Sequence, residues 1–164
     1  MSGPHAQTPA PSTGESDLHL ASQICFAVYS AAHAFNRIYK PLLDGLGLTY
    51  PQYLVLLLLW EEDGQTMKTI GQRLYLDSGT LTPLMKRLET AGFVSRSRDT
   101  QDERLMRITL TETGRMLRQK ALPFPEAIVC AAGQSPARLK LLRDEIVGLR
   151  DALHANAAQD RGID

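Results

Sequence analysis

One stretch in the middle of the 164-residue chain limits the possible folds more than any other feature. Thr66 is a helix-capping residue, and the pattern after it predicts a short helix over 67–74. A tight connection follows, after which Ser78 caps a second helix that runs to Ala91 and stops at Gly92. Two short helices joined by such a turn are a helix-turn-helix.

The residues after this unit predict a β-hairpin. Segments 93–98 and 104–110 have strand character, and Met106, Ile108 and Leu110 recur at a period of two. A polar tip of five residues separates the two segments. A helix-turn-helix followed by a hairpin is a winged helix, so we expect a mainly α fold with a small β-hairpin.

A helix is expected to precede the winged helix, beginning at Ser16 or Asp17. Pro41 and the glycines at 45 and 47 should break or end it. Its apolar stripe has helical spacing and consists of Leu18, Ala21, Cys25, Val28, Ala32, Phe35 and Tyr39. A second helix over 51–62 is apolar on almost every side, which predicts a buried central helix.

Two further helices are expected after the hairpin. Thr111 caps a long one that runs to about Ala132, with a break at Pro123 and Pro125. Ser135 and Pro136 open the last helix, which should end near residue 155. Its apolar stripe is Leu139, Leu142, Ile146, Leu149 and Leu153.

Five regions follow from these patterns. A winged helix needs no such long flanking helices, and we therefore expect them to form a dimerisation layer. The expected regions are a disordered tail over 1–16, dimerisation helices over 17–48 and 111–156, a winged-helix DNA-binding region over 49–110, and a frayed tail over 157–164.

Composition excludes several classes of protein. With 43% hydrophobic and 22% charged residues, the chain is neither fibrous nor disordered throughout. Two cysteines are too few for a disulfide scaffold but suffice for one redox pair. The longest apolar run, 54–60, is too short to span a membrane, and no secretory signal is evident. We expect a cytoplasmic protein with reduced thiols.

Charge is unevenly distributed along this neutral chain. Residues 66–120 contain eleven basic and six acidic side chains, a surplus of five positive charges. This surplus is a modest indication of an anion-facing surface, and charge alone favours a merely solvated face. A winged helix that binds protein instead of DNA is the alternative.

The winged helix predicts a set of DNA contacts. A recognition helix presents its first turns to base edges and phosphates, and wing arginines suit a narrow minor groove. Asp102 lies two residues before Arg104 and is placed to hold its guanidinium. A symmetric dimer on a palindromic operator in double-stranded DNA is the expected complex. The candidate contacts are Ser78, Gly79, Thr80, Thr82, Pro83, Lys86 and Arg87 of the helix, and Arg96, Arg98, Asp102, Arg104 and Arg107 of the wing.

Several motifs together resemble a known family. The chain is similar to the MarR family of winged-helix repressors, and within it to the organic hydroperoxide resistance regulators, over about residues 18–155. The motifs are Gln23-Ile24-Cys25-Phe26-Ala27-Val28-Tyr29-Ser30, Leu48-Thr49-Tyr50-Pro51-Gln52-Tyr53, the run Leu74-Tyr75-Leu76-Asp77-Ser78-Gly79-Thr80-Leu81-Thr82-Pro83-Leu84, Asp102-Glu103-Arg104 and Leu110-Thr111-Glu112.

The resemblance implies a homodimeric repressor that leaves DNA when an organic hydroperoxide oxidises it. It implies that Cys25 is the peroxidatic thiol, that Tyr39 and Tyr50 hydrogen-bond its thiolate, and that Tyr29 is a third, nearer tyrosine. Cys130 falls where two-cysteine members keep the thiol that resolves the sulfenic acid, by a disulfide between chains. No cofactor is implied.

Helix geometry agrees with part of this assignment. Tyr29 follows Cys25 by four residues, one turn along the same face. Tyr39 follows by fourteen residues, about 21 Å along a straight helix, so it can serve the same site only from a partner subunit. Spacing alone leaves open whether Cys25 and Cys130, 105 residues apart, pair within or between chains.

Other interpretations of the cysteine remain. Cys25 is on an apolar stripe and can be a small core residue, in which case the protein is a repressor that answers to a bound aromatic ligand. A thiol peroxidase would use the same chemistry, but no arginine near Cys25 is available to polarise a peroxide, and we expect no enzyme. Four scattered histidines, His5, His19, His33 and His154, and the lack of a Cys-x-x-Cys predict no metal site.

Overall fold

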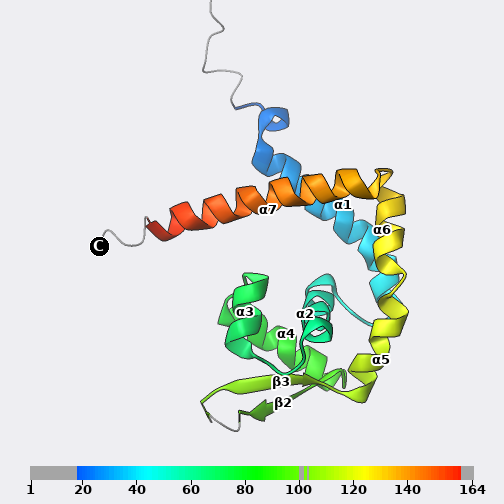
Figure 1. Ribbon diagram of the computed structural model, residues 1–164, viewed down its shortest axis with the longest axis vertical. Helices are drawn as coiled ribbons and strands as arrows, with labels where there is room; N and C mark the ends of the chain where they lie inside the picture. Colours follow the sequence, from blue (N-terminus) through cyan, green and yellow to red (C-terminus); the bar gives the residue numbers. More distant parts are fainter. Residues whose placement is uncertain (1–17, 100–101, 103, 160–164) are drawn as a thin grey trace, which may run out of the picture. The chain divides into compact units, whose positions relative to one another are not determined.

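The structure is a computed structural model that describes residues 18–99, 102 and 104–159. It divides into two compact units, one up to Arg37 and one from Ile38 onward. The elements (Figure 1) are η2 Leu20–Ser22, α1 Ile24–Asp44, α2 Tyr50–Glu61, β1 Gln65–Thr66, α3 Met67–Leu74, α4 Ser78–Thr90, β2 Val94–Arg98, β3 Met106–Leu110, α5 Glu112–Ala121, α6 Phe124–Ala132 and α7 Pro136–Gln159.

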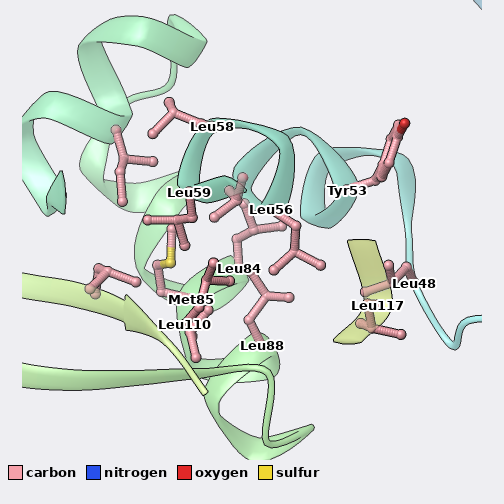
Figure 2. Packing of buried hydrophobic residues seen from close by; sticks show 14 of the residues in the cluster. Leu48, Tyr53, Leu56, Leu58, Leu59, Leu84, Met85, Leu88, Leu110 and Leu117 are labelled. Carbon is pink, nitrogen blue, oxygen red and sulfur yellow. The ribbon is translucent and has the colours of Figure 1, made fainter. Parts of the chain in front are cut away.

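The hydrophobic core lies in the second unit, around α2. As predicted, α2 is buried along most of its surface, and Val55 and Leu56 have no exposure. Figure 2 shows Leu84, Met85 and Leu88 of α4 pointing toward Leu56 and its neighbours. Burying an aliphatic side chain of this size contributes about 1.5–3 kcal/mol, so this cluster holds α2 and α4 together.

The helix-turn-helix is confirmed, with one correction to its capping. Thr66 caps α3 by accepting a hydrogen bond from the Thr69 backbone N–H at 3.1 Å. The cap of α4 is Asp77 and not Ser78, because the Asp77 carboxylate accepts from the Thr80 backbone N–H at 2.9 Å. Ser78 is the first helical residue instead.

The wing is also confirmed, with a strand that the sequence did not reveal. The sheet has the antiparallel order β1-β3-β2, and Figure 1 shows the hairpin of β2 and β3 beside α4. In β1, Gln65 pairs with Ile108, but two residues are too few to show a period. β3 begins at Met106 and not at 104, because Leu105 closes a turn onto the Asp102 carbonyl at 2.9 Å.

The first helix begins later than predicted. α1 starts at Ile24, whereas Ser16 and Asp17 lie outside the described residues. Just before α1 the Ser22 N–H donates to the His19 carbonyl at 2.9 Å, an i→i−3 bond typical of a 3₁₀ turn. Pro41 does not end α1, which continues to Asp44.

The C-terminal half follows the prediction except at its end. α5 and α6 are separated at 122–123, as expected from the prolines. The Ser135 hydroxyl accepts from the Arg138 backbone N–H at 3.2 Å, which caps α7. α7 then continues to Gln159, so 157–159 are helical where the frayed tail was expected to begin, whereas 160–164 lie outside the described residues. Over the described residues, no helix is long and apolar enough to cross a membrane.

Candidate DNA-binding surface and thiol site

The exposed side of α4 is the candidate DNA-reading surface. Leu81, Leu84, Met85 and Leu88 are buried, which fixes the opposite side of the helix toward solvent. The seven residues of this helix that are predicted to contact DNA all lie on that exposed side, namely Ser78, Gly79, Thr80, Thr82, Pro83, Lys86 and Arg87. The helix is therefore oriented as a recognition helix requires.

A surface hollow of about 420 Å³ adjoins the C-terminal half of α4. Lys86 and Arg87 line it together with Pro83, Thr90 and Ala91. Within 18–99, 102 and 104–159, neither cation forms an ion pair. Two unpaired cations beside a concave surface suit an anionic group such as a phosphate.

Two of the four wing arginines are engaged inside the protein. The Arg96 Nε donates to the Glu89 carboxylate at 2.7 Å and lowers the pKa of that carboxyl. The Arg107 Nε donates to the buried Asp99 carboxylate at 2.7 Å, and its Nη1 donates to the Gly64 carbonyl. Arg107 thus holds the base of the wing in place through its contacts with Asp99 and Gly64.

The other two wing arginines form no ion pair with any residue that the structure describes. Arg98 and Arg104 are exposed, and neither pairs with an acid among the described residues. The contact predicted between the Asp102 carboxylate and the Arg104 guanidinium is not formed. Asp102 instead accepts from the Arg104 backbone N–H at 3.0 Å, which shapes the turn and leaves the side chain available.

Two aspartates that support this surface were not identified from the sequence. Asp99 accepts from the Asp102 backbone N–H at 3.2 Å in addition to its ion pair with Arg107. Asp63 accepts from the Leu110 backbone N–H at 2.8 Å and pairs with Arg115 at 2.8 Å. An aspartate after a strand or before a glycine indicates a turn. No sequence pattern, however, predicts which distant residue such an aspartate pairs with.

The two tyrosines predicted to hydrogen-bond a thiolate lie side by side. The ring centroids of Tyr39 in α1 and Tyr50 in α2 are 4.8 Å apart, and Tyr53, which the sequence did not single out, is 5.8 Å from Tyr39. Burial, with added repulsion from the two neighbouring phenols, raises the pKa of Tyr39 to about 12. Burial also raises the pKa of Tyr50, so both hydroxyls remain protonated donors at neutral pH.

Both cysteines are free and exposed. Cys25 lies in the first turn of α1, in the first unit, and Cys130 lies in α6, in the second. Tyr29, one turn after Cys25, is exposed, and its ring meets the His33 ring edge-on with centroids 4.4 Å apart. The structure brings Tyr39 and Tyr50 together, whereas the grouping of Cys25 with them stays a prediction.

The described part of the chain carries several exposed histidine, cysteine and acidic side chains. No group of three or more histidine, cysteine or acidic side chains lies close enough there to hold a metal ion.

The fold and the exposed cationic helix define a winged-helix transcriptional regulator, and comparison with known proteins specifies which. Residues 37–121 match the family described as "Transcriptional regulator SarA/Rot". The chain is 53% identical over 146 residues to the HTH-type transcriptional regulator TtmR of Methylorubrum extorquens, covering 88% of this chain and 75% of that one. It is 47% identical over 137 residues to the organic hydroperoxide resistance transcriptional regulator of Bacillus subtilis, covering 84% and 93%.

Solved structures agree with these sequence relatives. AbfR of Staphylococcus epidermidis superposes with a TM-score of 0.69 at 38% identity, over 85% of this chain and 97% of that one. AbfR has also been solved reduced and bound to DNA, overoxidized and bound to DNA, and in a disulfide form, the last with a TM-score of 0.58. The chain therefore belongs to the MarR-like SarA/Rot family of transcriptional regulators, in the branch of the organic hydroperoxide resistance regulators.

Proposed function

We propose that the protein is a dimeric repressor that binds a palindromic operator and releases it when an organic hydroperoxide oxidises Cys25. The observation that carries the proposal is the pair of protonated phenols at Tyr39 and Tyr50, together with an exposed free thiol on α1. Two hydroxyl donors stabilise a thiolate and lower the pKa of its thiol, which is the condition for attack on a peroxide.

DNA binding is proposed for the surface built by α4 and the wing. Exposed hydroxyls at the start of α4 reach base edges, and Lys86 and Arg87 neutralise phosphates. Arg98 and Arg104 enter the flanking minor groove, while Arg107 and Arg96 keep the wing in shape through Asp99 and Glu89. AbfR, a structural relative, was solved bound to DNA, which supports this assignment. Chromosomal DNA as partner implies a cytoplasmic location.

Dimerisation is proposed for the long helices. In α7 the side chains of Leu142, Ile146 and Leu149 are all at least 40% exposed, and α1 exposes Phe35 and Ile38 similarly. An apolar face of this length is too large for a free monomer surface and fits a second copy of the chain. Two copies place two recognition helices on one operator.

The proposed chemistry has two steps. The Cys25 thiolate attacks the distal oxygen of the hydroperoxide, the O–O bond breaks, and the alkoxide leaves as an alcohol after taking up a proton, giving a sulfenic acid. The Cys130 thiol of the partner subunit then attacks the sulfenic sulfur, and water leaves as the disulfide forms. Because disulfide Cα atoms lie about 5.5 Å apart, bond formation shifts the helices and with them the half-site spacing.

The test is a gel shift on A·T-rich promoter DNA, with reduced protein and with protein treated with cumene hydroperoxide. We expect release of DNA and a dithiothreitol-reversible dimer band on a non-reducing gel. Cys25→Ser should bind DNA and ignore peroxide. A Cys25→Ser protein that peroxide still releases would contradict the sensor assignment.

Cys130→Ser separates the two steps, in buffer without small thiols. Without a resolving thiol, excess peroxide should overoxidise Cys25 with no dimer band, and the protein should stay on DNA. The overoxidized form of AbfR bound to DNA supports this expectation. Full release of DNA by Cys130→Ser would leave Cys130 as a packing residue in a one-cysteine sensor.

Two alternatives make different predictions in the same assays. A repressor that responds to a bound aromatic ligand would be released by that ligand regardless of Cys25. A thiol peroxidase would consume hydroperoxide over many turnovers when supplied with a dithiol, whereas a regulator consumes about one equivalent per Cys25. The regulator names of the relatives favour the stoichiometric outcome.

A further inference from the structure

Tyr75, in the turn of the helix-turn-helix, has an unusual backbone conformation. Its φ of 55° and ψ of 37° are left-handed, and among the described residues only glycines share a positive φ. The turn requires this conformation, because the Leu76 N–H closes onto the Gly71 carbonyl at 2.9 Å. Glycine is the usual residue at such a helix end, so a tyrosine there indicates that the ring itself is needed.

The ring of Tyr75 is in contact with the C-terminal half of α7. It stacks on the His154 ring with centroids 4.7 Å apart and 12° between the planes. The Arg150 guanidinium carbon lies 4.7 Å from the same ring centroid. Arg150 and His154 are one helical turn apart and share a face of α7, so both can contact the same ring. His154 stacks on the Tyr75 ring, and Arg150 makes a cation–π interaction with it.

This contact connects two parts of the second unit that the core does not connect. The described side chains of α7 are all outside the core cluster, whereas Leu81, Leu84, Met85 and Leu88 of α4 are in it. Arg150 is itself held by two hydrogen bonds to the Asp151 carboxylate, at 2.8 and 2.7 Å. α7 is therefore attached to the turn that leads into α4 through a restrained set of side chains.

We infer that Tyr75 is a positioning residue, through which α7 sets the orientation of the recognition helix α4. In a dimer that pairs through α7, this contact sets the distance between the two recognition helices, and thus the half-site spacing that is bound. Only Gly133, Gln134 and Ser135 separate α6, which carries Cys130, from α7. A movement of α6 at Cys130 would therefore be passed to α7, and through the Tyr75 contact to α4. This inference rests on the proposed DNA-binding function.

The test measures spacing preference with the full-length dimer. Fluorescence anisotropy compares the palindromic promoter duplex with the same duplex carrying one inserted base pair between its half-sites. Tyr75→Gly removes the ring and suits the left-handed turn, and Tyr75→Phe is the matched control that keeps the ring. The spacing preference is the ratio of the affinities for the two duplexes. We expect Tyr75→Gly to lower this ratio about tenfold, and Tyr75→Phe to leave it unchanged. A general loss of stability would lower both affinities without changing their ratio.

A second set of variants separates the α7 contact from any direct contact of Tyr75 with DNA. Replacing Arg150 and His154 by alanine should lower the spacing preference as Tyr75→Gly does, and the triple variant should be no worse than either. Additive effects, or an unchanged preference in the Arg150/His154 variant, would overturn the inference while leaving the proposed function intact. Failure of the wild-type protein to bind either duplex would overturn both.

Discussion

The winged-helix region and the long helices α1 and α7 bury their apolar residues to very different degrees. In the first, Val55, Ile70, Met85 and Ile108 are completely buried in one continuous core. In the second, α7 buries no residue over 136–157, where burial is described, and α1 buries only Leu43. Both regions contain leucine, isoleucine and valine, so the presence of large apolar side chains does not by itself explain the contrast.

The difference shows which part of the chain buries its apolar side chains without help from another molecule. The winged helix buries most of its apolar side chains in its own core. A rigid core of this kind is needed by a unit that presents a fixed face to a ligand. The long helices leave much of theirs exposed, and we propose that a second copy of the chain covers it. In the proposed dimer, a signal that acts at the long helices would change the spacing of the two recognition helices without disturbing the core of either winged helix.

The largest effect should come from charging the exposed face of α7. Leu142→Glu combined with Ile146→Glu places like charges on both sides of the proposed symmetric interface. We expect a monomer in sedimentation equilibrium, and a loss of about a hundredfold in DNA affinity once two half-sites are no longer bound together. The control Leu142→Met with Ile146→Leu keeps apolar volume and should stay dimeric. A charged variant that remains dimeric would place the interface elsewhere.

The core of the winged helix should respond to the removal of a single side chain. Met85 is fully buried between α4 and α2, and Met85→Ala leaves a cavity that should cost about 3 kcal/mol in the free energy of unfolding. Met116 is 61% exposed, and Met116→Ala should change that free energy by about 0.5 kcal/mol or less. Urea denaturation of the two variants measures the difference. Equal effects would mean that Met116 is covered in solution.

Two glycines sharpen the comparison further, Gly114 packed against the winged helix and Gly148 in α7. A Cβ on Gly114 in α5 would lie 2.0 Å from the Phe93 carbonyl oxygen, so Gly114→Ala should cost about 2–3 kcal/mol through overpacking. A Cβ on Gly148 in α7 meets nothing within 4 Å in one chain, so Gly148→Ala should stabilise the helix by about 0.5–1 kcal/mol. Thermal unfolding tests both. Destabilisation by Gly148→Ala would indicate close packing of a partner there.

The smallest effect at neutral pH should come from the tyrosine cluster, which titrates only in base. The pKa of Tyr39 is raised to about 12 in the folded protein, above its ordinary value of 10.0, so the folded state holds this proton more tightly. The resulting stability is fully present below pH 10 and falls as the pH rises from 10 to 12. Urea denaturation at a series of pH values measures the free energy of unfolding, which should fall less steeply with pH in Tyr39→Phe than in the wild type. Identical slopes would show that the phenol is solvated in solution.

The sequence alone determined the helix-turn-helix and the wing, because their signals are local. Thr66 and Gly92 act on backbone groups within a few residues of themselves, and the period of two over 106–110 is visible within five residues. The Asp77 cap was missed by one position, because neighbouring Asp and Ser are both good caps and only the backbone conformation distinguishes them. The pairing of Tyr39 with Tyr50 could be expected from the family resemblance, but their closeness is not marked in the sequence.

Only the tertiary structure decided the contacts between distant residues. The strand pair Gln65 with Ile108 and the stacking of Tyr75 on His154 each join residues far apart in the chain. Such contacts depend on how whole elements pack, and each partner taken alone has an unremarkable sequence context. Local capping and periodicity act over a few residues, whereas these contacts form only after the elements that carry them have been brought together, which is why they became visible only in the folded chain.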